Sequence, residues 1–270
     1  RPVVLIHGWP LSAQAWEPQV SVLQAAGFRV VAYDRRGFGR SDKPASGYSY
    51  DTLADDLQRV MVQCGLQDVT LVGFSMGGGE VARYVARHGQ SRLRSVVFAS
   101  AVPPYLMKTA DNPEGPLTSE KAQQKKHALE QDRSAYFEQF TQNFFSSNGL
   151  LQVTESQRNE AVAICHQSAQ HAALACMDSF STTDFREDLK KLTAATLPTK
   201  PTAPFSAAPR SAVTAMPARS IYPEDFLDVQ QHADFFVSLG QYDQAIDVLK
   251  KSIHDTSESS PLAYLELLKI

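Results

Sequence analysis

The sequence contains no apolar run that approaches the ~20 residues of a membrane-spanning helix, and it has only three cysteines among its 270 residues. Neither sign of charge dominates, because the net charge is only −3, which gives no support for a nucleic-acid or anionic-membrane partner. Cys64, Cys165 and Cys176 are odd in number and widely spaced, so they predict neither a disulfide framework nor a zinc site. We interpret them as buried free thiols and expect a cytoplasmic protein.

The composition is that of a globular protein, with 43% hydrophobic and 20% charged residues. Apolar β-branched runs alternate with segments whose apolar residues recur at helical spacing. This alternation predicts an α/β fold with a parallel sheet that is covered on both faces. The expected strands lie near 3–7, 28–33, 69–74 and 94–99, and the helices between them near 13–26, 50–63 and 77–88.

An expected strand-to-helix turn carries the main chemical motif, Gly73-Phe74-Ser75-Met76-Gly77. The pattern Gly-x-Ser-x-Gly belongs to a strained turn that lifts a serine hydroxyl clear of a sheet. Gly73 and Gly77 fit this turn because strand and helix approach too closely there for side chains. We predict that Ser75 is a nucleophile and that the backbone N–H of Met76 receives the oxyanion formed on attack. The competing interpretation is a tight glycine turn with an incidental serine.

The second oxyanion donor is expected in the loop after the first strand, which reads His7-Gly8-Trp9-Pro10. Gly8 lets the backbone approach the serine and Pro10 favours an extended Trp9, so the Trp9 N–H is the candidate. His7 ends a strand beside the turn, and we interpret it as a hydrogen-bonded structural residue rather than a base. The charges in the 34–41 loop are interpreted as ion pairs that fix the loop, not as a phosphate site.

Taken in order, these motifs resemble the α/β-hydrolase fold and, more narrowly, the cofactor-free bacterial haloperoxidases and their esterase relatives. The resemblance covers residues 1–198 and includes Ser100-Ala101-Val102-Pro103-Pro104 and the run 180–185. It implies an α/β-hydrolase core with an α-helical cap at about 105–180.

The resemblance also implies a chemistry. It implies hydrolysis of small-molecule esters, and synthesis of peracids from carboxylic acids and hydrogen peroxide, which then oxidise halide. No metal, haem or other cofactor is implied. Ser75 would be the nucleophile, with Trp9 and Met76 as the oxyanion donors. Aromatic residues recur at helical spacing in the expected cap, where they would form core and could in part line an acyl site: Tyr136, Phe137, Phe140, Phe144 and Phe145.

The resemblance stops before the acid and base of the family. There, a strand after a Leu-Pro-Thr turn leads to a Gly-Asp motif, and the catalytic histidine lies near the C-terminus. This chain has Leu197-Pro198-Thr199, but proline-rich sequence follows that cannot form a central strand, and neither the Gly-Asp motif nor a terminal His-Gly pair is found. The triad Asp and His are therefore not identified. A serine enzyme that loses its base loses on the order of 10⁶ in turnover.

No other Asp or His is a strong candidate for the catalytic acid or base. Three aspartates match surface positions of the family's cap and the helix after it, namely Asp178, Asp184 and Asp188. The histidines that we considered lie in the expected cap or near the C-terminus: His127, His166, His171, His232 and His254. Each could reach Ser75 in principle, but none has a setting that indicates a base.

The composition changes at the end of the core. Ala, Ser, Thr and Pro dominate residues 195–223, which predicts an extended linker without a core. Residues 224–270 resemble a tetratricopeptide-repeat fragment, with Ala233 and Ala245 where the helices touch and Gly240 in the turn. A generic helical hairpin is the alternative, since stacks of such repeats usually need about three or more.

The chain is thus interpreted as a partial α/β-hydrolase domain at 1–194, a linker and a helical appendage. The join would come from a gene fusion, a frameshift or an artefact of sequence assembly. Arg1 is not a methionine and the family's first two strands are missing, so we expect a truncated start, before which a leader could lie. Missing late strands would leave the 94–99 strand as a bare edge. Two functions remain open: a serine hydrolase impaired by the missing acid and base, or an inactive fusion or truncation product whose hairpin at 224–270 binds a protein partner.

Overall fold

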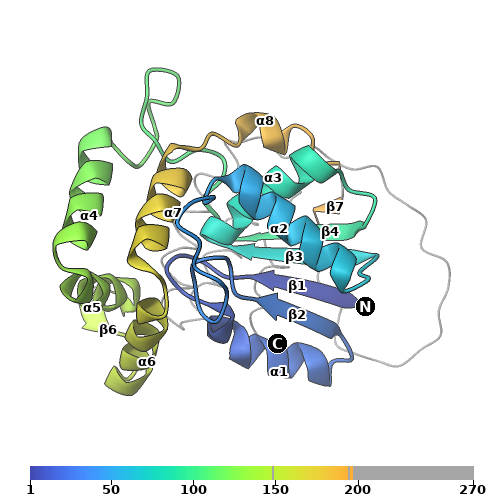
Figure 1. The fold of residues 1–270 in the computed structure, drawn as a ribbon, viewed down its shortest axis with the longest axis horizontal. Coiled ribbons are helices and arrows are strands. Elements are labelled where there is room, and N and C mark those ends of the chain that lie inside the picture. Colours follow the sequence, from blue (N-terminus) through green and yellow to red (C-terminus); the bar gives the residue numbers. More distant parts are fainter. Residues whose placement is uncertain (148, 194, 197–270) are drawn as a thin grey trace, which may run out of the picture.

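The computed structural model describes residues 1–147, 149–193 and 195–196, and it shows a twisted sheet flanked by helices (Figure 1). All strands of this sheet are parallel, in the order β2-β1-β3-β4-β7. The strands are β1 (Pro2–Ile6), β2 (Arg29–Tyr33), β3 (Val69–Phe74), β4 (Leu93–Ala99) and β7 (Ala195–Thr196). The helices beside them are the 3₁₀-helix η1 (Ala13–Trp16), α1 (Glu17–Ala25), α2 (Tyr50–Gln63), α3 (Met76–His88) and α8 (Arg186–Leu189).

Alternate residues of the strands pack on opposite faces of the sheet, as the two-residue period of a strand requires. Val4 and Ile6 of β1 belong to the large core that includes α2 and α3, whereas Val3 and Leu5 pack with Trp16 and Leu23 on the η1–α1 side. The predicted parallel α/β sheet with both faces covered is therefore confirmed.

Strand β4 is not a bare edge. Residues 195–196 pair with it in parallel register, Ala195 opposite Ser95 and Thr196 opposite Val96. Both residues precede Pro198, the first proline of the segment, so both keep the backbone donors that a ladder needs. The expectation of a bare edge is wrong here, and the first two positions of the predicted linker are strand. The rest of the linker and the helical segment 224–270 lie outside the described residues.

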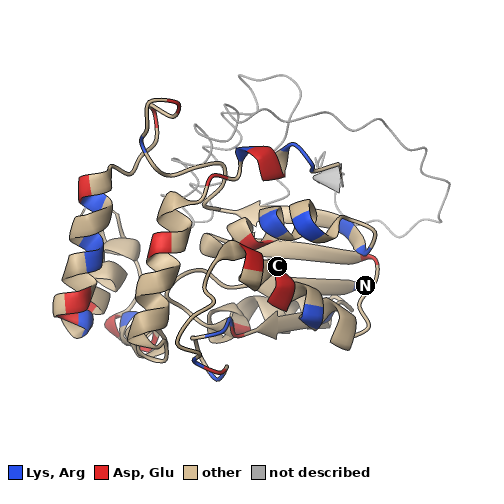
Figure 2. Ribbon diagram, turned by 45° about the horizontal axis from the view of Figure 1, so that its top comes forward, with Lys and Arg blue, Asp and Glu red and all other residues tan. Residues whose placement is uncertain are grey.

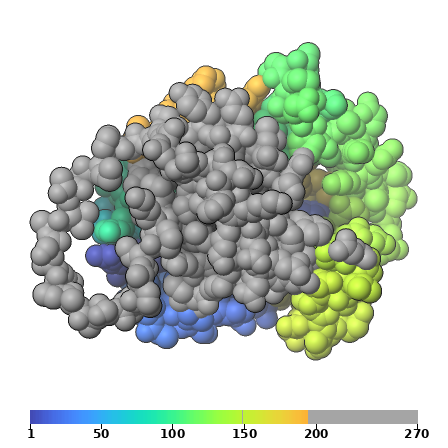
Figure 3. All heavy atoms as spheres, turned by 180° about the vertical axis from the view of Figure 1, so that it is seen from behind, coloured from blue at the N-terminus to red at the C-terminus, as the bar shows by residue number. Residues whose placement is uncertain are grey.

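A second group of helices stands beyond the tips of the strand arrows, at one side of the molecule (Figures 1 and 3). It consists of α4 (Ser119–Gln131), α5 (Arg133–Phe144), α6 (Glu155–His166) and α7 (Gln170–Thr182), with the short strands β5 (Ser146–Ser147) and β6 (Leu150–Leu151) between α5 and α6. Three of these helices begin where a side chain caps them: Thr118, Asp132 and Thr154 each accept a bond from a backbone N–H of the first turn.

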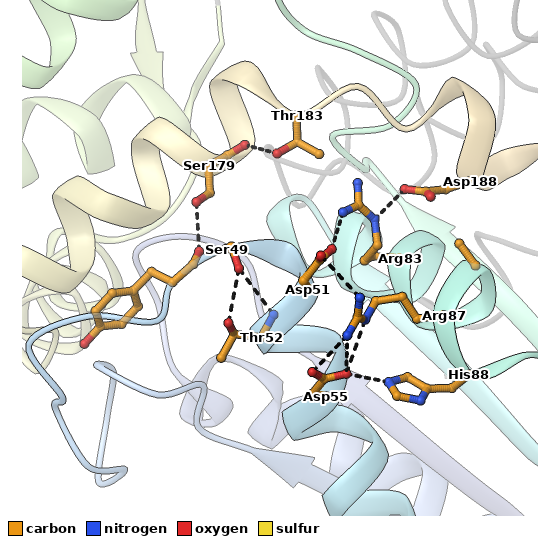
Figure 4. A network of polar contacts seen from close by, with 12 residues as sticks. Ser49, Asp51, Thr52, Asp55, Arg83, Arg87, His88, Ser179, Thr183 and Asp188 are labelled. Carbon is orange, nitrogen blue, oxygen red and sulfur yellow. Dashed lines mark hydrogen bonds and ion pairs between the residues drawn. The ribbon is translucent and has the colours of Figure 1, made fainter.

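Charged side chains lie mainly on helices and loops, while the strands are mostly uncharged (Figure 2). Many of them pair between helices. Arg83 of α3 donates hydrogen bonds to Asp51 of α2 and Asp188 of α8 (Figure 4). Asp55 of α2 forms hydrogen bonds with both Arg87 and His88 of α3. These contacts tie α2, α3 and α8 into one layer. Within the described residues, no helix combines the length and apolar content needed to cross a bilayer.

Candidate active site

The site forms where neighbouring strands send their connections to opposite faces. β1 and β3 are hydrogen-bonded neighbours, yet the chain leaves β1 toward α1 on one face and β3 toward α3 on the other. In open α/β sheets, the carboxyl ends of two such strands border a crevice in which ligands bind. Gly8 and Trp9 follow β1, and Ser75 follows β3, so the two predicted motifs meet at this crevice.

Ser75 occupies a strained turn. Its φ of 52° and ψ of −116° lie in a region that residues with a β-carbon rarely adopt. Three backbone bonds hold it there: its N–H donates to the Ala99 carbonyl at 3.0 Å, and its own carbonyl accepts from Gly78 and Val102, each at 3.0 Å. The hydroxyl itself has no hydrogen-bond partner within the described part of the chain.

The glycines around the serine are required by close backbone contacts. A β-carbon on Gly73 would lie 2.5 Å from the Gly77 carbonyl oxygen, and one on Gly77 would lie 2.5 Å from the Ile6 carbonyl oxygen. A β-carbon on Gly8 would lie 2.8 Å from the Phe74 ring and 3.1 Å from the Ser75 β-carbon. The close approach that we inferred from the motif is therefore present at all three glycines.

Among the described residues, two N–H groups beside the serine find no acceptor. Met76 is the first residue of α3, so no helical carbonyl can reach its N–H. The Trp9 N–H likewise has no acceptor among the residues that the structure describes. The sequence did not predict a further contact here, the Tyr50 hydroxyl that donates to the Met76 carbonyl at 3.1 Å and braces the start of the helix.

A cavity of about 350 Å³ opens onto Ser75. Aromatic residues dominate its wall: Trp9, Phe74, Tyr136, Phe140, Phe144 and Phe180. Lys125 is the one charged residue among its described lining. Part of the predicted aromatic stripe thus faces the cavity, whereas Phe137 is fully buried in the core. Burial raises the pKa of Tyr136 to about 12, so its hydroxyl stays neutral at ordinary pH.

Comparison with known proteins identifies the fold family. The sequence profile of the alpha/beta hydrolase fold matches residues 1–250. The chain belongs to the alpha/beta hydrolase fold family. That match extends across most of the segment that we predicted as linker and appendage.

Relatives of this α/β hydrolase include haloperoxidases and an esterase. It is 46% identical over 201 residues to a putative non-heme chloroperoxidase of Synechocystis, covering 73% of this chain and 71% of the relative. It is 39% identical over 198 residues to a bifunctional esterase/perhydrolase of Acinetobacter calcoaceticus, covering 71% and 70%. A crystal structure of a bromoperoxidase from Bacillus anthracis is similar with a TM-score of 0.70 and 50% identity, covering 71% and 70%.

The described histidines of this α/β hydrolase lie away from the serine hydroxyl. The ring of His7 is buried, and its nitrogens bond the Gly8 carbonyl at 2.8 Å and the Arg35 N–H at 3.0 Å, as expected for a structural residue. His88 bonds Asp55, and His171 bonds the Pro44 carbonyl. Neither these three nor His127 and His166 line the cavity.

The aspartates that we considered are engaged elsewhere. Asp178 pairs with Lys126, Asp184 with Arg186, and Asp188 with Arg83, and none of the three lines the cavity. In the 34–41 loop, Asp34 accepts from the Ala13 and Arg40 backbone N–H groups, and Arg36 pairs with Asp56, as expected for charges that fix a loop. Within the described residues, no group of three or more His, Cys, Asp or Glu side chains could hold a metal ion.

Proposed function

We propose that this α/β hydrolase is a serine hydrolase of the esterase and cofactor-free haloperoxidase type, which acts on ester and carboxylic acid carbonyls through Ser75. One observation carries the proposal: Ser75 lies on a strained turn in the wall of a largely apolar cavity, and within the described residues neither its hydroxyl nor the Trp9 and Met76 N–H groups beside it have a partner. The relatives support it, since they include a putative chloroperoxidase, a bromoperoxidase and an esterase/perhydrolase.

In the proposed reaction, the Ser75 oxygen bonds to the carbonyl carbon while its proton passes to a base. The carbonyl oxygen becomes an oxyanion that accepts from the Trp9 and Met76 N–H groups, and the positive end of α3 favours this charge. The bond to the alcohol then breaks and leaves an acyl-serine. Water releases the carboxylic acid, or hydrogen peroxide releases a peracid, which then oxidises halide.

The cavity defines the acyl group. Its aromatic wall favours an apolar chain or ring, because each buried methylene contributes about 0.8 kcal/mol to binding. The volume of about 350 Å³ is at the small end of ligand cavities, so we expect short or single-ring acyl groups.

A fluorophosphonate probe tests the role of the serine, because it labels only a serine that can attack. We expect the folded chain to be labelled and Ser75→Ala to be inert, both to the probe and to p-nitrophenyl acetate. Ser181→Ala is the matched control, since Ser181 is a second serine in the wall of the same cavity. It should be labelled like the unchanged chain.

Labelling that survives in Ser75→Ala would disprove the role of Ser75. A chain that melts cooperatively but is not labelled would instead favour the second hypothesis, an inactive fusion or truncation product whose segment 224–270 binds a protein partner.

A further inference from the structure

A buried ion pair lies behind the site and takes no part in the proposed reaction. Arg35 and Glu80 are 1% and 0% exposed, and the Arg35 Nε donates to one Glu80 oxygen while the Tyr33 hydroxyl donates to the other at 2.9 Å. Replacing a buried ion pair by apolar residues is often neutral or stabilising. Stability alone therefore does not account for the pair.

Arg35 also fixes the ring of His7. Its Nη2 donates to the His7 carbonyl at 2.6 Å, and its backbone N–H donates to the ring Nε2 at 3.0 Å. A neutral imidazole has one donor and one acceptor nitrogen. Because Nε2 accepts from the Arg35 N–H, we assign the proton to Nδ1, which donates to the Gly8 carbonyl at 2.8 Å, while the Arg35 Nη1 lies 3.3 Å from Nδ1. Burial and the charge of Arg35 hold the pKa of His7 well below its usual value of 6.5, which keeps the ring neutral.

The Gly8 carbonyl belongs to the same peptide unit as the Trp9 N–H. This peptide bond is trans, so its C=O and N–H point in opposite directions from one rigid plane. The carbonyl accepts from both His7 and the Leu11 N–H, the latter at 3.1 Å. Fixing that oxygen from one side therefore fixes the direction of the Trp9 N–H on the other side.

We propose that Arg35 and Glu80 are positioning residues that, through His7, aim the Trp9 N–H at the oxyanion formed on Ser75. The inference rests on the proposed role of Trp9. Glu80 lies one turn after Met76 on α3, so the helix that presents the first donor also anchors the second. The Trp9 and Met76 N–H groups are thereby both held in place by α3. The ion pair resists movement of the loop after β1 relative to this helix.

Removing both charges together separates positioning from stability. The double variant Arg35→Met/Glu80→Leu leaves no unpaired charge, although the Tyr33 hydroxyl and the His7 carbonyl each lose a partner, so it should still melt cooperatively but at a lower Tm. Its kcat for p-nitrophenyl acetate should fall at least tenfold with KM changed by less than about threefold, because loss of one oxyanion donor costs about 10²–10³ in kcat. Arg83→Gln is the matched control: it breaks an ion pair on the same helix but away from the loop, and kcat should not change.

A conservative variant covers the case in which the double variant does not fold. Arg35→Lys keeps the charge for Glu80, but its single ammonium cannot serve both Glu80 and the His7 carbonyl. We expect a smaller drop in kcat, again with little change in KM. A folded double variant or Arg35→Lys variant with the kcat of the unchanged chain would overturn the proposal.

A spectroscopic measurement tests the positioning role of Arg35 and Glu80 even if the chain proves inactive. ¹⁵N–¹H spectra of the imidazole should show the Nδ1–H tautomer of His7 at neutral pH, and the Trp9 backbone amide signal should shift in the double variant. Absence of labelling at Ser75 would disprove the proposed function alone. An unshifted Trp9 amide signal would disprove the positioning role, whatever the activity.

Discussion

Replacing Ser75 by glycine should stabilise the protein relative to replacing it by alanine, although both changes remove the hydroxyl. Alanine keeps the β-carbon that is strained at a φ of 52°, whereas glycine adopts this conformation without cost. Strain of this kind costs of order 1–3 kcal/mol. Glycine also increases the conformational entropy of the unfolded chain, which lowers the stability of Ser75→Gly by about 0.5–1 kcal/mol. The middle of these two ranges leaves Ser75→Gly more stable than Ser75→Ala by about 1 kcal/mol.

Thermal melts of the two variants measure this difference. A change of 1 kcal/mol shifts Tm by about 2–4 °C for 150–250 residues. Ser75→Gly should thus melt about 2–4 °C above Ser75→Ala.

The same pair of substitutions at Ser181 provides the matched control. Ser181 lies inside α7, where glycine is about 1 kcal/mol worse than alanine, so the order of the two melting temperatures should reverse. If Ser75→Gly melts at or below Ser75→Ala, the turn stores no strain in its serine and the reasoning fails.

Three further predictions follow from the same geometry. Gly77→Ala should abolish probe labelling and lower Tm, because its β-carbon would lie 2.5 Å from the Ile6 carbonyl oxygen and force α3 away from β1; unchanged labelling would contradict this. The lowered pKa of His7 means that the unfolded chain takes up its proton first, so stability should fall by about 1.4 kcal/mol per pH unit below about 6.5. Urea titrations measure the free energy of unfolding at pH 5.5 and 7.5. The unchanged chain should lose more of it between pH 7.5 and 5.5 than His7→Gln does, because only the unchanged chain has the His7 contribution. Phe140→Ala enlarges the cavity, so the ratio of kcat/KM for p-nitrophenyl hexanoate over acetate should rise, and a falling ratio would place the acyl chain elsewhere.

The sequence was informative where the physical constraint is local. Gly73, Ser75 and Gly77 lie within five residues, and the contacts that require glycine are set by one strand and the helix that follows it. The apolar runs likewise predicted four strands of the sheet. Strand β7 was missed because a pairing of two residues has no periodicity and depends on β4, which is about 100 residues earlier in the chain.

The sequence has no comparable motif for the proposed positioning residues Arg35 and Glu80. Glu80 stands among helical residues as a single acidic side chain, which usually indicates a solvent-exposed position. Its partner Arg35 is 45 residues away, in a loop with several other charges. Only the fold shows that this one arginine is fully buried, while its neighbour Arg36 is partly exposed and pairs with Asp56 of α2. The cavity was partly missed for the same reason, since its wall combines residues from distant segments.

The expectation that no base activates Ser75 leads to a last prediction. Five of the seven histidines are described, and none of them lines the cavity; the other two are His232 and His254. The proline-rich sequence before them lacks the family's acid motif, so we expect no histidine to activate Ser75 and labelling to be slow. His232→Ala and His254→Ala should then label at the rate of the unchanged chain. Because a working base contributes on the order of 10⁶ in turnover, a drop of 10³ or more in either variant would identify that histidine as the base and refute this expectation.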